Sequence, residues 1–182
     1  METVLEGERL VVRPFVMDDL NAIHTVMTDG FGGGMPLEER RDWLSWTILG
    51  YTVQARLYQP PYGERAVVLK STGELIGAVG LVQSYGPFSK LPFFGGQEGG
   101  FTPEMGLFWV IAPAMQGQGY ATEAAQILIK FMFKEWNLAR IIATTEYDNA
   151  ASIGVMRRLG MTIERNPDPT PEWFQVVGIL QA

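Results

Sequence analysis

The stretch that most constrains this chain is Glu104 to Trp136, which has the pattern of a strand, a glycine-rich turn and a helix. Its first part, up to Ile111, is a nearly continuous apolar run, as expected for a strand covered on both faces. Its last part carries an apolar stripe at three- and four-residue spacing, formed by Ala121, Ala125, Leu128, Met132 and Trp136. The pattern predicts a central strand followed by a helix that packs on the sheet.

Between these two elements lies the turn Gln116-Gly117-Gln118-Gly119-Tyr120-Ala121. Glycines let the backbone approach another group closely, and the first amide groups of a helix have no partner within it. These N–H groups and the helix dipole make an anion site, for which a pyrophosphate is a natural occupant. The turn lacks the lysine of a P-loop, and Thr122 stands where the dinucleotide fingerprint needs glycine.

Composition indicates an ordinary soluble domain. The chain has 182 residues, 47% hydrophobic and 19% charged, which suits a single domain over residues 1–182. No apolar run approaches the roughly 20 residues of a membrane span, and the N-terminus lacks the pattern of a secretory signal, so no membrane partner is expected. The absence of cysteine excludes disulfides and thiolate metal sites and favours a cytoplasmic location. A net charge of −6 argues against a nucleic-acid surface and favours a cationic partner.

The rest of the chain is predicted to mix strands and helices. Strands are expected at about residues 10–14, 65–70, 74–85, 104–111, 140–145, 161–164 and 173–180. Helices are expected at about residues 18–30, 36–58, 120–136 and 149–159. The connector around Gly73 predicts a hairpin, and the central strand, its helix and the next strand predict a parallel βαβ unit.

Residues 86–103 form a long segment rich in Gly, Pro and Phe, directly before the central strand. Structureless connectors longer than about 12–15 residues are uncommon and are usually functional or disordered. The segment is either a lid or pocket wall lined by Phe93, Phe94 and Phe101, or an extended hairpin insertion or oligomer contact. Whether the protein forms a homodimer therefore stays an open question. His24, the one histidine, lies beside an apolar helical stripe and is expected to be half-buried or exposed rather than catalytic.

Together with a second motif, the glycine turn resembles the GNAT family of N-acetyltransferases. Gln116, Gly119 and Ala121 match its Gln/Arg-x-x-Gly-x-Gly/Ala signature. Residues 149–152, Asn-Ala-Ala-Ser, followed by Met-Arg-Arg-Leu-Gly-Met at 156–161, are similar to its Asn-x-x-Ser/Ala … Lys/Arg-Leu-Gly-Phe segment. The two motifs lie one strand apart in the family's order. Within the family the chain looks closest to the ribosomal-protein N-terminal acetyltransferase (RimJ/RimL-like) branch.

This resemblance implies an α/β (α+β) fold with a mixed, mostly antiparallel sheet of six or seven strands and about four flanking helices. The sheet would be splayed between its fourth and fifth strands, Glu104–Ile111 and Arg140–Thr145, with the pantetheine arm of acetyl-CoA in the gap. The arm would pair with the backbone of Trp109, Val110 and Ile111 and touch Asn149. The pyrophosphate would be held by backbone N–H groups of Gln116, Gly117, Gly119, Tyr120 and Ala121.

The resemblance also implies direct attack of a primary amine on the thioester, with a carboxylate as general base. Glu104, at the start of the central strand, is the first candidate and Glu98 the second. The N–H of Val110, if freed by a bulge, would stabilise the oxyanion. Many family members protonate the departing thiolate with a tyrosine where this chain has Met156. Ser152 is then the remaining donor candidate, unless it merely caps its helix.

The sequence therefore predicts an N-acetyltransferase that moves an acetyl group from acetyl-CoA to a primary amine, without a metal. The amine belongs either to a protein N-terminus or to a small molecule. The alternative is a non-catalytic CoA-binding or regulatory module, which would be consistent with the absence of the tyrosine. A structural interaction domain with an empty groove is the third hypothesis. Binding of acetyl-CoA separates the third from the others, and turnover separates the first two.

Overall fold

The computed structural model describes residues 3–60, 62–97 and 99–182. In these ranges the α-helices are α1 (Leu20–Phe31), α2 (Leu37–Arg56), α3 (Tyr120–Trp136) and α4 (Ala150–Arg158). The strands are β1 (Leu5–Glu6), β2 (Leu10–Arg13), β3 (Gly63–Leu69), β4 (Leu75–Gly86), β5 (Thr102–Ile111), β6 (Arg140–Thr145), β7 (Thr162–Arg165) and β8 (Val176–Gln181). Short 3-10 helices lie at Met17–Asp19, Phe88–Lys90, Pro92–Phe94, Pro113–Met115 and Glu172–Phe174.

The strands follow the order β1-β2-β3-β4-β5-β6-β8-β7 in one sheet. Neighbours β1–β2, β2–β3, β3–β4, β6–β8 and β7–β8 are antiparallel. In contrast, β5 pairs with β6 in parallel, with Gly106 opposite Ile142, and no further pair between them occurs in the described residues. This confirms the predicted mixed, mostly antiparallel fold, the parallel βαβ unit and four helices. The predicted strand count was one or two too low, because the two-residue β1 is too short to leave a periodic pattern.

The chain divides into two compact units. Unit 1 contains residues up to Leu81 and Phe108–Trp136, and unit 2 contains Val82–Leu107 and Asn137–Ala182. Strands β4 and β5 each continue from one unit into the other. That the whole chain acts as one domain, as the sequence suggests, stays a prediction.

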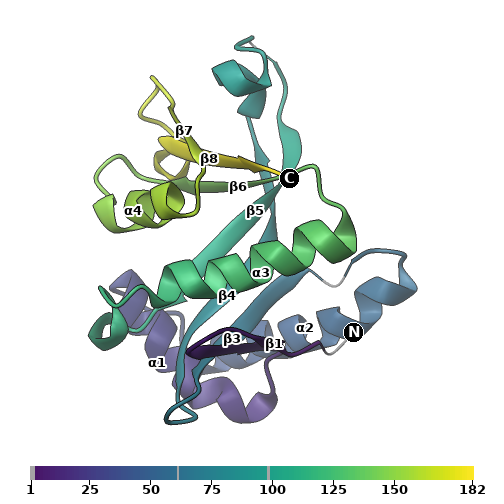
Figure 1. Cartoon of the computed structure of the whole chain (residues 1–182), viewed down its shortest axis with the longest axis vertical. Helices are drawn as coiled ribbons and strands as arrows, with labels where there is room; N and C mark the ends of the chain where they lie inside the picture. The colour runs from purple at the N-terminus through teal and green to yellow at the C-terminus, as the bar shows by residue number, and fades with distance from the viewer. Residues whose placement is uncertain (1–2, 61, 98) are drawn as a thin grey trace. The chain divides into compact units, whose positions relative to one another are not determined.

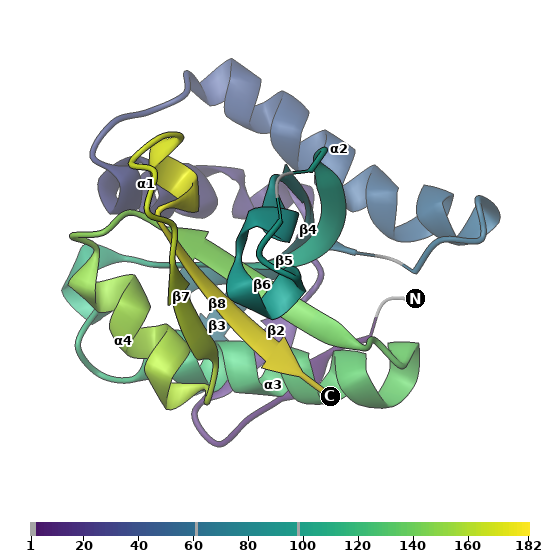
Figure 2. The ribbon, with the colours of Figure 1, turned by 90° about the horizontal axis from the view of Figure 1, so that it is seen from above.

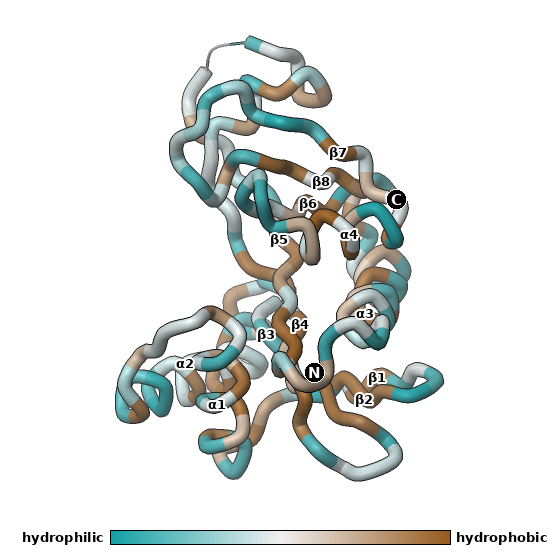
Figure 3. The backbone as a smooth tube through the Cα atoms, turned by 90° about the vertical axis from the view of Figure 1, so that its left-hand side faces the viewer, coloured by the Kyte–Doolittle hydropathy of each residue, from teal (hydrophilic) through white to brown (hydrophobic). Residues whose placement is uncertain are grey.

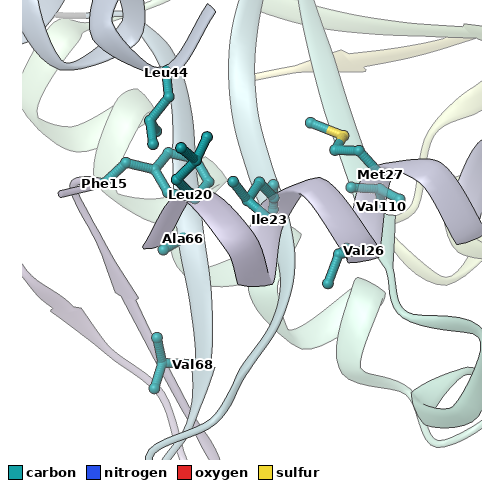
Figure 4. Close-up of a cluster of buried hydrophobic side chains, with 10 residues drawn as sticks. Phe15, Leu20, Ile23, Val26, Met27, Leu44, Ala66, Val68 and Val110 are labelled. Atoms are coloured by element: carbon teal, nitrogen blue, oxygen red, sulfur yellow. The ribbon is translucent and has the colours of Figure 1, made fainter. Parts of the chain in front are cut away.

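In unit 1, α1 and α2 lie on one side of the strands and α3 lies on the other (Figures 1 and 3). Apolar side chains of α1 point toward Phe15 and Leu44 at one end and toward Val110 of β5 at the other (Figure 4). The buried cluster consists of Phe15, Leu20, Ile23, Val26, Met27, Leu44, Ala66, Val68, Ala78 and Val110. Helix α1 ends at Phe31 and is followed by Gly32, whose φ of 67° is the left-handed conformation typical of a helix stop. This core fixes the C-terminal part of β5 within unit 1.

In unit 2, α4 lies along β7 and β8 (Figure 2). A second buried cluster contains Phe88, Leu91, Ile142, Phe174, Val177 and Ile179, with Phe93 and Phe94 packed against it. Three aromatic residues of the 86–103 segment, Phe88, Phe93 and Phe94, are thus anchored on the core of this unit, whereas Phe101 is 59% exposed. The lid, insertion and oligomer-contact hypotheses for this segment stay predictions. Within the described ranges, no helix is long and apolar enough to cross a membrane.

Candidate functional site

The turn between β5 and α3 has a backbone that depends on glycine. Gly117 and Gly119 have φ values of 75° and 83°, which side chains rarely permit. The side-chain amide of Gln116 donates a hydrogen bond to the carbonyl oxygen of Ile111 at 2.9 Å and ties the turn back to its strand. The N–H of Glu123 then bonds to the carbonyl of Gly119 at 3.0 Å, so helical bonding begins there. The N–H of Gln116 donates to the carbonyl oxygen of Pro113 at 3.2 Å. The amides of Tyr120 and Ala121 precede the first helical bond, which is the arrangement of an anion site.

A cation that sequence analysis missed lies beside this turn. The guanidinium of Arg9 donates to the carbonyl oxygen of Gln118 at 3.0 Å and lies 4.6 Å from the ring centre of Tyr120. More than 100 residues separate it from the turn along the chain, so no local pattern could have revealed the contact.

The C-terminal end of β5 lies very close to a glycine of the neighbouring strand. A Cβ atom added to Gly77 of β4 would lie 2.4 Å from the carbonyl oxygen of Val110 and 2.6 Å from Cδ1 of Ile111. Cβ atoms normally stand out of a pleated sheet, so a carbonyl of the next strand in that position marks a local departure from the regular pleat. An irregular strand is what a free Val110 N–H requires. The oxyanion role of this N–H, and pantetheine pairing by Trp109 and Ile111, stay predictions.

Glu104 is paired with Arg140. Glu104 is 8% exposed, and its two carboxylate oxygens accept hydrogen bonds from Arg140 Nε at 2.8 Å and Nη2 at 2.5 Å. The parallel register that sets Gly106 opposite Ile142 also brings these two residues together at the starts of β5 and β6. The hydrogen bond to Glu104 raises the pKa of Arg140 despite some desolvation. Glu104 must therefore share its oxygens with a permanent cation in any proton transfer.

Asn149 is the N-cap of α4. Its Oδ1 accepts a hydrogen bond from the N–H of Ser152 at 3.0 Å, which satisfies an amide that the helix leaves without a partner. The remaining NH₂ group of Asn149 is the part of this side chain suited to a pantetheine contact. Ser152 is half-buried in the first helical turn, and its role as proton donor stays a prediction. Met156, where the resemblance implies a tyrosine in many family members, is fully buried with its sulfur near Gly178.

The predicted site residues divide between the two units. Trp109, Val110, Ile111, Gln116, Gly117, Gly119, Tyr120 and Ala121 belong to unit 1, and Glu104, Asn149 and Ser152 belong to unit 2. Glu98, the second candidate base, lies outside the described residues. His24 is half-buried, and its Nδ1 has no hydrogen-bond partner among the residues described. Across the described ranges, no group of three or more His, Cys, Asp or Glu residues could hold a metal ion.

Comparison with known families gives a match over most of the chain. The profile described as "Acetyltransferase (GNAT) domain" matches residues 9–162. Among curated proteins, the uncharacterized N-acetyltransferase YnaD of Bacillus subtilis is 48% identical over 66 residues. That match covers 36% of this chain and 38% of YnaD, so it spans well under half of either protein. The spermidine N(1)-acetyltransferase of Escherichia coli is 24% identical over 156 residues, covering 84% of this chain and 73% of that enzyme.

Solved structures share the fold over almost the full length. An acetyltransferase from Agrobacterium tumefaciens has a TM-score of 0.69 and 26% identity, covering 99% of this chain and 95% of its own. A GNAT-family acetyltransferase from Bacillus anthracis has a TM-score of 0.70 and 24% identity, with 97% and 96% covered. RimL, a ribosomal L7/L12 alpha-N-protein acetyltransferase solved with coenzyme A, has a TM-score of 0.67 and 17% identity, with 97% and 96% covered. The similarity to the Bacillus anthracis protein and to RimL is a similarity of fold alone.

Proposed function

Because this chain belongs to the GNAT family of acetyltransferases, we propose that it transfers an acetyl group from acetyl-CoA directly to a primary amine. Acetyl-CoA is the acyl donor of the family. The observation that carries the proposal is the turn at the start of α3, where Gly117 and Gly119 adopt positive φ directly before a 17-residue helix. This geometry exposes amide donors at the positive end of a helix dipole.

In the proposed complex, the pyrophosphate accepts hydrogen bonds from the backbone N–H groups of the turn. Those donors belong to Gly117, Gly119, Tyr120 and Ala121, whereas the Gln116 N–H already donates to the carbonyl oxygen of Pro113 at 3.2 Å. A diphosphate suits this turn because glycine permits close approach and the dipole favours negative charge. The pantetheine arm would extend along the backbone of residues 109–111 and contact the amide group of Asn149.

The proposed reaction is a direct displacement. A neutral amine attacks the thioester carbonyl carbon, the carbon–sulfur bond breaks, and coenzyme A leaves as a thiolate. The Val110 N–H stabilises the negative charge that develops on the carbonyl oxygen. The amine loses one proton to a base, and the thiolate gains one through the Ser152 hydroxyl or a water molecule bound to it. The serine then regains its proton from water. The chain has no cysteine, so a covalent acyl-cysteine intermediate on the protein is excluded.

We assign the base to Glu104, acting through water. Its ion pair with Arg140 uses one lone pair on each carboxylate oxygen, and a carboxylate offers about four such acceptor positions. The remaining positions can hold a water molecule that relays the proton from the amine. Because Glu104 is buried and fixed at two points, this water would be held in a defined place.

The acceptor in this proposal is a primary amine of a protein N-terminus or of a small molecule. The names of two similar proteins specify these two kinds of acceptor, a polyamine and a ribosomal protein. The net charge of −6 favours encounter with a cationic acceptor. A cytoplasmic location, without a nucleic-acid or membrane partner, belongs to the same proposal and is supported by the acidic, cysteine-free composition.

Calorimetric titration with acetyl-CoA tests the binding site. We expect micromolar binding by the wild type and loss of binding in Gly119→Glu, whose carboxylate would enter the anion site. Gly119→Gln is the matched control, because it strains the same backbone without adding charge, and it should bind more tightly than Gly119→Glu. Gly73→Glu adds the same charge at a φ of 74° in the β3–β4 turn, where a Cβ would meet nothing within 4 Å, and should leave affinity unchanged. A wild type that gives no heat would refute the proposal.

Release of the coenzyme A thiol tests turnover. A thiol reagent reports this product without background, since the protein itself has no cysteine. Spermidine and a short peptide with a free N-terminus are the first acceptors to compare. The second candidate, a non-catalytic CoA-binding module, is favoured by the buried Met156 at the position of the family's tyrosine. It predicts acetyl-CoA binding with no thiol release for any amine.

A further inference from the structure

Arg9 makes several contacts with the glycine turn and the first turn of α3. Its Nη1 donates to the carbonyl oxygen of Gln118 at 3.0 Å, and its Nε donates to Glu123 Oε2 at 2.7 Å. Its backbone N–H donates to Glu123 Oε1 at 2.8 Å. The guanidinium also lies over the ring of Tyr120. One residue thus contacts three positions around the proposed pyrophosphate site.

The β1–β2 hairpin places Arg9 in this position. The N–H of Gly7 bonds to the carbonyl of Leu10 at 2.8 Å and closes the hairpin. A Cβ added at Gly7 would lie 2.4 Å from Cδ1 of Ile127 and 2.9 Å from Oε1 of Glu123, so the hairpin backbone packs directly on α3. Figures 1 and 3 both show β1 and β2 beside this helix. Arg9 is therefore presented to the turn from a fixed backbone.

The contact with Glu123 has an electrostatic consequence. Glu123 lies in the first turn of α3, where a carboxylate competes with a bound anion for the positive end of the helix. Both of its oxygens are engaged by Arg9, so the pair is neutral and its carboxylate is held by the turn of the β1–β2 hairpin. Without the guanidinium, a negative charge would remain beside the proposed diphosphate and repel it.

We propose that Arg9 is a positioning residue for the acyl donor: it holds the Gln116–Tyr120 turn in its binding conformation through the Gln118 carbonyl and neutralises Glu123. This inference rests on the proposed function. It adds a contact from the opening hairpin to a site otherwise formed by the β5–α3 connection. The Arg9 side chain is 44% exposed, so the expected effect is moderate, roughly a tenfold loss of acetyl-CoA affinity on Arg9→Ala.

The test compares two acyl donors. Arg9→Ala should weaken acetyl-CoA binding in calorimetry and raise KM for acetyl-CoA, with kcat at saturation little changed. S-acetyl-pantetheine has no diphosphate, so kcat/KM for this donor should stay within about twofold of wild type. Arg9→Lys keeps the charge and should recover part of the loss. The double variant Arg9→Ala/Glu123→Gln should bind acetyl-CoA more tightly than Arg9→Ala, because the unneutralised carboxylate is removed.

A matched control comes from the same part of the fold. Lys70→Ala removes the exposed Lys70–Glu6 ion pair, 2.9 Å long, and leaves the glycine turn untouched. Its affinity for acetyl-CoA should equal that of wild type. The inference is overturned if Arg9→Ala binds acetyl-CoA as wild type does, or if both donors lose equally. Absence of binding by the wild type would instead overturn the proposed function, so the two failures are distinguishable.

Discussion

Replacing Gly77 with alanine should destabilise the protein and disturb β5 at the proposed oxyanion donor. The new Cβ would lie 2.4 Å from the carbonyl oxygen of Val110, and relief of that contact requires a shift of about 1 Å. The carbonyl belongs to the backbone, so it cannot rotate away as a side chain would. Overpacking of this kind costs about 1–3 kcal/mol, and we expect the upper end. Alanine also lowers the conformational entropy of the unfolded chain, which stabilises the folded protein by about 0.4–1 kcal/mol. The expected net decrease in the free energy of unfolding is therefore roughly 2 kcal/mol.

Thermal unfolding measures this loss directly. For a chain of this length, 1 kcal/mol shifts Tm by about 2–4 °C, so Gly77→Ala should unfold roughly 4–8 °C below wild type. Gly33→Ala is the matched control, because its Cβ meets nothing within 4 Å and Gly33 has no positive φ. That variant should unfold within about 1–2 °C of wild type. Equal Tm values for the two variants would refute the close approach of β4 and β5, and with it the structural basis for a displaced Val110 N–H.

Two further predictions concern proton transfer and pH. Glu104→Gln should lower kcat at least tenfold while leaving acetyl-CoA affinity unchanged, and unaltered turnover in the thiol assay would remove Glu104 from the mechanism. The buried hydroxyl of Tyr51 donates to the carbonyl oxygen of Glu64, and desolvation by burial raises the pKa of Tyr51 to about 12. The pKa of Tyr51 is higher in the folded protein than in the unfolded chain. The neutral Tyr51 hydroxyl should therefore stabilise the fold fully below about pH 10, and this stabilisation should disappear as pH rises toward 12. Urea unfolding from pH 9 to 12 should show this decline in wild type and a smaller one in Tyr51→Phe.

Much of the fold could be predicted because its patterns are local. Neighbouring residues specify the apolar stripe of α3, the hairpin around Gly73 and the caps of α4. The observed elements agree with their expected positions to within a few residues. Segment 86–103 has no such period. Its two 3-10 turns are joined by the contact between Phe88 and Phe94, and Phe88 also packs against Phe174 of a distant part of the chain.

The candidate site was less completely predictable. The glycine turn and the Asn149 cap follow from residue types at fixed spacing, so both could be identified from the sequence. The Glu104–Arg140 pair does leave a signal in the sequence, because opposite charges stand at the starts of two strands expected to run parallel. Arg9 left no signal, because one arginine just before a short strand looks the same in the sequence whether it faces solvent or a loop.

The sequence by itself determined the order of elements, the positive-φ glycines before α3 and the absence of a cysteine nucleophile. These properties depend on the periodicity, steric size and chemistry of residues close together in the chain. Tertiary structure alone decided that Arg9 contacts Gln118 and Glu123. It also decided that the Val110 carbonyl lies close to Gly77, and that Arg140 donates hydrogen bonds to both carboxylate oxygens of Glu104. Such contacts depend on strand register and helix packing, which are set by the burial of whole faces and cannot be derived from any one segment.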